Sequence, residues 1–156
     1  MYELFVLGEL MDQPAHGYLL HSIIKSAVGP IRRLSWGALY PLMRRLEQEG
    51  LIAPVPAMEV GACAGADGRR RKVYGITEAG RERFFALMAE PGAYDTEYPD
   101  LFSIKLSNFH HVARELRLEI LRHYRGYVQL LLSYMQTSRR RIEAEPRIPA
   151  AERPCI

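Results

Sequence analysis

The sequence predicts a mainly α-helical protein with one small β-hairpin, organised as a compact N-terminal domain followed by a long helical region. Three observations predict this class. Residues 1–50 contain three short segments with helical apolar spacing, separated by turn residues. Two short segments of strand character then flank a Gly-rich stretch, and residues 113–145 repeat apolar side chains at three- and four-residue spacing. A chain of 156 residues is long enough for a small domain plus an attached helical piece.

The composition is that of a folded protein without membrane segments. Hydrophobic residues make up 48% and charged residues 25% of the chain, as in ordinary globular domains. No apolar run reaches the roughly 18 residues of a membrane span. Glu3 and Glu9 interrupt the N-terminal apolar residues, so we expect no secretory signal. Cys63 lies in a Gly/Ala loop and Cys155 beside the C-terminus, which favours incidental thiols in a reduced, cytoplasmic protein.

The net charge of +3 is too mild to indicate a nucleic-acid partner by itself. Such an interpretation depends on where the basic residues cluster. The clusters are Arg32-Arg33, Arg44-Arg45, Arg69-Arg70-Arg71-Lys72 and Arg139-Arg140-Arg141.

The first two predicted helices are short and closely connected. Tyr2–Met11 places leucines on one face, and Gln13-Pro14 ends this helix. His16-Gly17-Tyr18 opens the second helix, and Gly29-Pro30 closes it. With the segment that follows, they form a three-helix cluster compatible with helix-turn-helix architecture.

The segment Ser35–Ile52 predicts the third helix and the main functional face. Ser35 is a good N-cap, and Gly50 is a good stop because glycine takes the left-handed conformation without steric cost. One face is apolar, with Leu39, Leu42, Met43 and Leu46 at helical spacing. The opposite face carries Gly37, Tyr40, Arg44 and Gln48. Those side chains suit a helix in a DNA groove, while a solvated helix surface is the other interpretation.

A β-hairpin and a fourth helix follow. Leu51–Val55 and Arg69–Ile76 are the predicted strands, the prolines of the first mark an edge strand, and the Gly-rich residues 59–68 form the tip. Four basic residues therefore lie on the returning strand, where they would contact phosphates. Thr77 caps a fourth helix, which ends at Pro91-Gly92. Three helices, a basic hairpin and a returning helix constitute a winged helix-turn-helix.

Three sequence blocks resemble the PadR family of bacterial transcriptional regulators. The blocks are His16-Gly17-Tyr18; Ser35–Pro41 with Arg45-Leu46-Glu47 and Gly50-Leu51-Ile52; and Gly68–Tyr74 with Ile76–Gly80. They stand in the family's order and spacing. The resemblance implies a DNA-binding winged helix, usually repressing, joined to a C-terminal helical region that forms a homodimer. It also implies that Pro41 lies inside the recognition helix, although proline ordinarily breaks a helix.

From the third helix, the hairpin and this resemblance we predict the residues that contact double-stranded DNA. They are Tyr18, Ser35, Gly37, Tyr40, Arg44, Arg69, Arg70 and Lys72. Tyr40 and Arg44 would contact the groove, and the basic arm would contact phosphate or the minor groove. A solvated surface is the alternative interpretation of both sets.

The C-terminal half predicts a dimerisation region. Asp100–His111 forms a helix, and residues 113–145 form a long helix. Along the long helix, a coiled-coil-like seam contains Leu116, Ile120, Tyr124, Tyr127, Leu131 and Tyr134. A second stripe beside the seam contains Leu121, Tyr124, Val128, Leu132 and Met135. One short helix cannot cover so wide an apolar face, so we expect a second copy of the chain to cover it.

An aromatic set near the predicted linker is the expected place for a small-molecule effector. It consists of Tyr94, Tyr98, Phe102 and Phe109. The resemblance implies such a site, because members of the family often sense small aromatic or drug-like molecules. Hydrophobic core is the alternative interpretation of these residues.

We expect no catalytic site, no metal site and no cofactor. His110, His111 and Glu115 lie close together along a predicted helix, but no Cys/His cluster or further acidic motif in the sequence supports them as metal ligands. No Ser/His/Asp set, phosphate loop or carboxylate pair indicates an enzyme.

The resulting hypothesis divides the chain into a winged helix-turn-helix domain (1–90), a linker (91–99), a helical dimerisation region (100–145) and a flexible tail (146–156). It describes a homodimeric repressor that binds an inverted-repeat operator and is released by a small aromatic or drug-like effector. The alternative is a winged-helix protein-interaction module without specific DNA binding, which would show no salt-dependent affinity for DNA.

Overall fold

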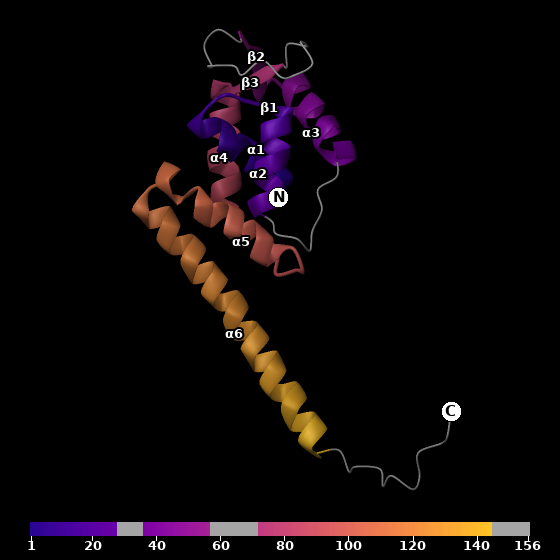
Figure 1. Ribbon diagram of the computed structural model, residues 1–156. Coiled ribbons are helices and arrows are strands. Elements are labelled where there is room, and N and C mark those ends of the chain that lie inside the picture. Colours follow the sequence, from indigo (N-terminus) through magenta and orange to yellow (C-terminus); the bar gives the residue numbers. More distant parts are fainter. Residues whose placement is uncertain (28–35, 57–71, 145–156) are drawn as a thin grey trace, which may run out of the picture. The chain divides into compact units, whose positions relative to one another are not determined.

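The computed structural model describes residues 1–27, 36–56 and 72–144. Helices predominate and one small antiparallel sheet accompanies them (Figure 1), so the predicted fold class is confirmed. The elements are α1 (Tyr2–Asp12), β1 (Ala15–His16), α2 (Gly17–Ala27), α3 (Trp36–Gln48), β2 (Ile52–Val55), β3 (Val73–Ile76), α4 (Glu78–Ala89), α5 (Tyr98–Ser107), the 3-10 helix η1 (Phe109–His111) and α6 (Arg114–Ala144). The predicted Ser35 cap, the tip of the hairpin and the tail lie outside the described residues.

The chain forms two compact units, Met1–Ile120 and Leu121–Ile156. The first unit is larger than the predicted 1–90 domain, because Ile104, Val112 and Ile120 all pack into its hydrophobic core. Tyr98, in the segment predicted as a linker, is also buried. Within the described ranges, none of the helices has the uninterrupted apolar length that a bilayer span requires.

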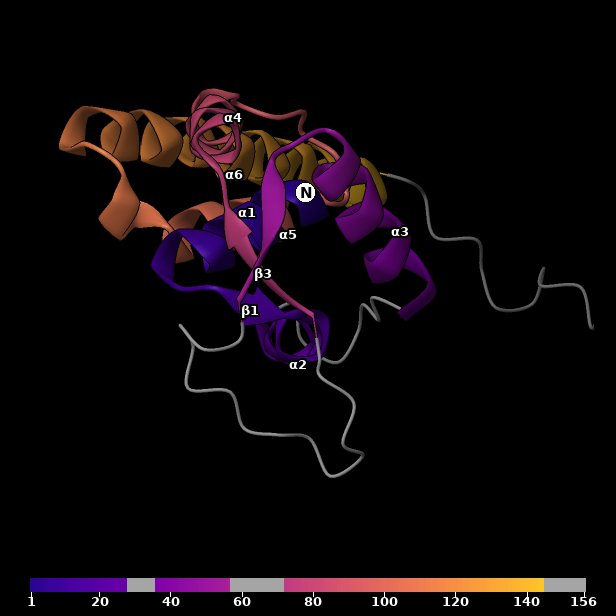
Figure 2. The ribbon, with the colours of Figure 1, turned by 90° about the horizontal axis from the view of Figure 1, so that it is seen from above.

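The core of the first unit surrounds α1. This helix is apolar on almost every side, as expected of a helix enclosed by others, and the view from above shows it between α2 and α4 (Figure 2). The largest fully buried side chains of the unit are Leu4, Leu7, Leu20, Leu39, Met43, Leu46, Ile52, Phe84 and Met88. Every helix from α1 to α4 therefore contributes to one core, which fixes the orientation of α3.

The sheet has three strands in the order β1-β3-β2, all antiparallel. Ile52 pairs with Ile76 and Val55 with Val73, so β2 and β3 form the predicted hairpin and Pro54 lies in an edge strand. The third strand, β1, was not predicted, because two residues beside a helix start carry no strand periodicity. Viewed from above, β1 lies along β3 next to the start of α2 (Figure 2). The sheet thereby ties the hairpin to the helical cluster.

A cap and two glycines connect α3, β2 and α4. Gly50 has a φ of 72° and ends α3 as predicted. The Thr77 hydroxyl accepts from the Gly80 N–H at 3.1 Å and lies 2.6 Å from the Gly50 carbonyl oxygen, to which it donates. A Cβ on Gly80 would lie 2.0 Å from the Leu51 carbonyl oxygen. Thr77 therefore caps α4, and Gly80 allows the backbone of α4 to pass close to the backbone at Leu51.

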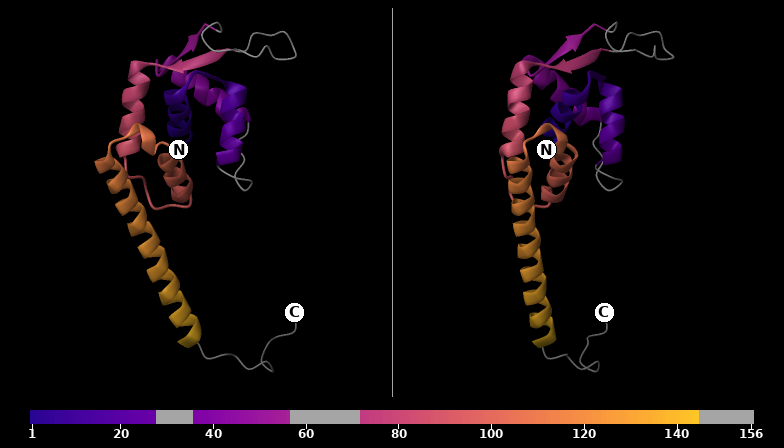
Figure 3. Two further views of the ribbon diagram at one scale, coloured as in Figure 1. Left: turned by 60° about the vertical axis from the view of Figure 1, so that its left-hand side comes forward. Right: turned by 90° about the vertical axis from the view of Figure 1, so that its left-hand side faces the viewer.

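The predicted single helix Asp100–His111 was wrong in its extent. α5 already begins at Tyr98 and stops at Ser107, and η1 follows. Asn108 separates them, because its side-chain amide donates to the Ile104 carbonyl at 2.8 Å and competes with the helical pattern. In both views of Figure 3 the β2–β3 ribbon lies at the start of α4, and α5 lies near its end.

Candidate nucleic-acid interface

Helix α3 separates an apolar face from a polar one. Leu39, Met43 and Leu46 are buried and anchor the helix in the core. Tyr40 and Arg44, one turn apart, are exposed on the other face, and the Tyr40 side chain is 55% exposed. Pro41 lies inside the helix near its start, as the family resemblance implied. The apolar face of α3 that the sequence predicted is therefore the face that packs into the core.

The start of α2 lies against the same face. The His16 Nδ1 atom accepts from the Leu19 N–H at 3.0 Å, so His16 caps the first turn of α2, which agrees with its interpretation as a helix-start residue. A Cβ on Gly17 would lie 3.3 Å from the Met43 sulfur. Next to this close approach of α2 to α3, the Tyr18 side chain is 56% exposed and lies near Tyr40.

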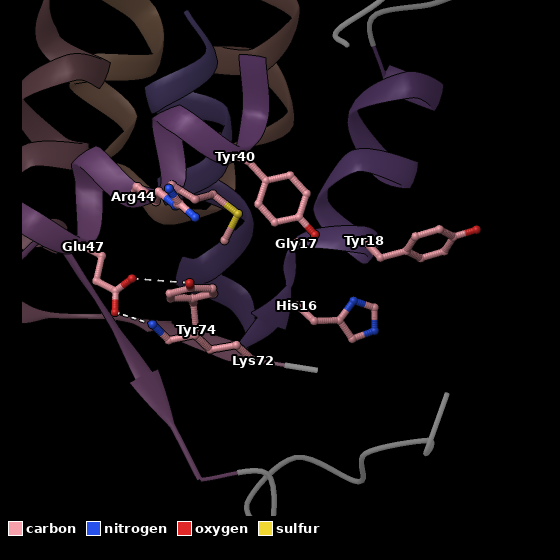
Figure 4. Close-up of a pocket in the computed structure, with 9 residues that line it drawn as sticks. His16, Gly17, Tyr18, Tyr40, Arg44, Glu47, Lys72 and Tyr74 are labelled. Carbon is pink, nitrogen blue, oxygen red and sulfur yellow. Dashed lines mark hydrogen bonds and ion pairs between the residues drawn. The ribbon is translucent and has the colours of Figure 1, made fainter. Parts of the chain in front are cut away.

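These elements and β3 surround a hollow of about 510 Å³ (Figure 4). Its lining comes from three parts of the chain that are distant in sequence. The residues are His16, Gly17, Tyr18, Tyr40, Met43, Arg44, Glu47, Lys72 and Tyr74. The two exposed phenols lie on one side of Figure 4, and the charged groups lie on the other.

The charged side of the hollow contains a small hydrogen-bonded network. Lys72 donates to Glu47 at 2.5 Å, and the Tyr74 hydroxyl donates to the other Glu47 oxygen at 3.3 Å. The hydrogen bond from Lys72 holds the pKa of Glu47 below its usual range, and the same bond raises the pKa of Lys72. Arg44 adds a second positive charge close enough to lower the pKa of Glu47 further. Two cations and one carboxylate leave the hollow with a net positive charge.

The neighbouring Arg45 has a different environment from Arg44. Arg45 donates to Glu3 at 2.8 Å, and Arg83 donates to the other oxygen of the same carboxylate at 2.7 Å. Glu3 thus joins α1, α3 and α4. In the part of the chain that the structure describes, no ion pair engages Arg44. Of the Arg44-Arg45 cluster, one residue connects helices and the other is presented to solvent.

The structure brings together four of the eight residues predicted to contact DNA. Tyr18, Tyr40, Arg44 and Lys72 line the hollow, while Gly37 is exposed on α3 outside the lining. The other three, Ser35, Arg69 and Arg70, lie outside the described residues. The prediction omitted Glu47, whose position three residues after Arg44 places it on the same side of a helix.

Two residues of the predicted dimerisation seam are used within the chain. Ile120 is 7% exposed in the core of the first unit, and Leu116 packs against that core. Both side chains therefore serve the core of the first unit, and a part for them in a dimer interface stays a prediction. Further along α6, in the second unit, Leu131 is 43% and Tyr134 71% exposed. Tyr124 and Tyr127 place their ring centroids 5.9 Å apart.

The aromatic set predicted for an effector is largely packed. Tyr98 is buried, and Phe102 and Phe109 pack against the core of the first unit. Tyr94 is 41% exposed, and its ring meets the Tyr98 ring edge-on at 5.1 Å. These positions favour the hydrophobic-core interpretation for three of the four residues. An effector site there stays a prediction.

The chain matches a family model described as the transcriptional regulator PadR-like family, over residues 6–86. It is also 35% identical over 80 residues to a 37.1 kDa protein in transposon TN4556 of Streptomyces fradiae. That match covers 51% of this chain and 20% of the relative, so the chain spans about a fifth of that protein's length.

Two solved structures of Bacillus subtilis PadR are similar to this chain. The structure in complex with operator DNA has a TM-score of 0.50 at 20% identity, covering 95% of this chain and 80% of that one. The structure in complex with p-coumaric acid has a TM-score of 0.46 at 19% identity, covering 95% and 79%. At this identity the first likeness supports the fold.

Proposed function

The chain belongs to the PadR-like family of transcriptional regulators, and on that premise we propose that it binds an inverted-repeat DNA operator as a homodimer and represses transcription. The observation that carries the proposal is the hollow on which Tyr18, Tyr40, Arg44 and Lys72 converge. Three sequence-distant elements present phenol, guanidinium and ammonium groups on one positively charged face. Such a face suits a polyanion with readable base edges.

In this proposal α3 enters the major groove. Arg44 is the best candidate for a base contact, because guanidinium groups donate two parallel hydrogen bonds to guanine. Tyr40 lies one turn earlier on the same face and is also exposed. Lys72 immediately precedes β3, where an ammonium group suits a phosphate contact that gives affinity without sequence information.

A change of Arg44 to Ala tests the groove assignment. We expect Arg44→Ala to weaken binding to a selected operator by about 1–3 kcal/mol and to relax specificity at one base pair. The operator is first obtained by selecting bound sequences from random DNA, and affinity is then measured by gel shift. Arg122→Ala, which removes the same charge from an exposed position of α6, serves as the matched control.

Two results would contradict the assignment. Equal affinity of Arg44→Ala and Arg122→Ala would remove Arg44 from the interface. Absence of any salt-dependent DNA affinity in the purified wild-type protein would favour the protein-interaction module instead.

We further propose that the second unit supplies the homodimer. Apolar side chains follow one another along α6 at intervals of three, four and seven residues and are all more than a third exposed. They are Leu121, Val128, Leu132, Met135 and Ile142. Exposed apolar stripes of this spacing on a long helix are ordinarily covered by another helix. A two-fold dimer would present two α3 helices to two half-sites, which explains the expected palindromic operator.

Release by a small aromatic molecule completes the proposed regulation. Tyr94 supports it most directly, since its ring is partly exposed beside Tyr98. Titration of phenolic acids into the operator complex, followed by gel shift, tests it. Release by a compound in wild-type protein but not in Tyr94→Ala supports the assignment, and equal release from both proteins contradicts it.

A further inference from the structure

Asp12, His110 and His111 come together at the end of α1, although Asp12 and His110 are 98 positions apart in sequence. Asp12 is the last residue of α1, and the two histidines form the last two residues of η1. The Nε2 atoms of His110 and His111 lie 3.0 Å and 3.1 Å from the same oxygen, Oδ1 of Asp12. All three ligand-type atoms lie within 4.8 Å of one another.

We propose that Asp12, His110 and His111 bind a divalent transition-metal ion of the Zn²⁺ type. Two imidazole nitrogens and one carboxylate oxygen are the donor set that such ions prefer. Tetrahedral Zn²⁺ with bonds near 2.0–2.1 Å places its ligand atoms about 3.3 Å apart. The two nitrogen–oxygen separations in the structure are within a few tenths of an ångström of that value. The exposed side of the cluster leaves solvent as the fourth ligand.

The environment of His111 supports a ligand role. Its side chain is 14% exposed, and its ring is held edge-on to Phe84 at a centroid distance of 5.7 Å. Its buried Nε2 atom lies at ion-pair distance from Asp12, yet it makes no well-formed hydrogen bond with any group in the described part of the chain. A buried polar atom without a hydrogen-bond partner is costly unless a further partner binds it.

Some of the charges around the cluster favour a bound cation and others oppose it. The negative end of the α1 dipole lies at Asp12 and favours a cation. Burial, and then the nearby His110, lowers the pKa of His111. Arg81 also lowers that pKa and opposes a cation.

The test is a titration of the tag-free full chain with ZnCl₂ by isothermal calorimetry. Cys63→Ser and Cys155→Ser are introduced first, since thiolates also bind zinc. We expect one Zn²⁺ per chain and a higher melting temperature with Zn²⁺, because an ion that binds the folded state alone stabilises it. Co²⁺ in place of Zn²⁺ should give the visible absorption of a tetrahedral site.

Asp12→Asn and His110→Ala are the informative variants, because both side chains are more than half exposed and their loss should leave the fold intact. Each should weaken Zn²⁺ binding about tenfold or more, since even groups that only support a ligand contribute 10- to 100-fold. His123→Ala, which removes a histidine of α6, is the matched control and should bind like the parent. Binding of one Zn²⁺ with parental affinity by both variants, or no binding by the parent, would overturn the proposal.

Discussion

At the scale of single residues, Glu47 decides how much positive charge the proposed DNA face presents. Its carboxylate accepts from both Lys72 and Tyr74. The ion pair orients the Lys72 side chain but also competes with any phosphate for its ammonium group. Since the pKa of Glu47 is lowered in the folded state, the ion pair stabilises the protein at pH values above the pKa of an ordinary glutamate. That contribution is lost as pH falls through the lowered pKa.

The change Glu47→Gln should therefore strengthen binding to DNA of any sequence. It frees Lys72 for a phosphate, and the slope of log affinity against log salt should steepen by about 0.9 for one additional phosphate contact. Affinity is measured on random-sequence duplexes at several salt concentrations. Glu49→Gln makes the same charge change two residues later, beside Arg45, and is the control. Identical slopes for the two variants would show that loss of the Glu47 carboxylate gives Lys72 no additional phosphate contact.

At the scale of elements, Lys105 fastens α5 to the end of α4. It is 3% exposed, and its ammonium group donates to the carbonyl oxygens of Met88, at 3.0 Å, and Glu90. Those carbonyls belong to the last turn and cap of α4, which have no partners within the helix. Burial lowers the pKa of Lys105, with the negative charge of Glu90 acting against that shift. A lysine thus takes a core position because it caps a helix C-terminus.

Replacement of Lys105 by Met should destabilise the protein, although the new side chain is apolar and of similar length. One buried and one partly buried carbonyl lose their donor, which costs about 1–3 kcal/mol of unfolding free energy. Urea denaturation at one fixed protein concentration measures the loss. Arg122→Met, at an exposed position, should change the unfolding free energy little. A loss no larger than that of the control would show that water or another group satisfies these carbonyls.

At the scale of the whole molecule, the exposed apolar stripe of α6 is the feature that calls for a second chain. Leu132 is 54% and Met135 66% exposed in the second unit. Leu130 and Tyr134 are also exposed, so apolar side chains extend around much of the helix. A single chain that left this surface in water would be prone to association. The operator proposal requires that association to be a closed two-fold pair.

A charge placed in the stripe should separate the dimer. We expect Leu132→Asp to give a monomer in analytical ultracentrifugation and to weaken operator binding while half-site binding persists, because an unpaired buried carboxylate is costly. Thr137→Asp is the control, since at 100° per residue Thr137 lies on the opposite side of the helix. A Leu132→Asp protein that remains dimeric would exclude this stripe as the interface.

The sequence by itself determined most local features. Caps and stops gave α1, α3 and α4 close to their observed bounds, since Gly50 and Thr77 act on neighbouring backbone only. The exposed face of α3 followed from helical periodicity, which is why Tyr40 and Arg44 could be selected together. The family blocks lie within these same local patterns, and the matching family model covers them.

Only the tertiary structure decided which distant residues meet. It joined Asp12 to His110, Lys105 to the end of α4, and Lys72 to Glu47. It also buried Ile120 in the core of the first unit. Periodicity reports which face of an element is apolar, but not which element covers that face. The helices and the α3 face could therefore be predicted from local sequence, whereas their ion pairs and the histidine cluster depended on packing between distant elements.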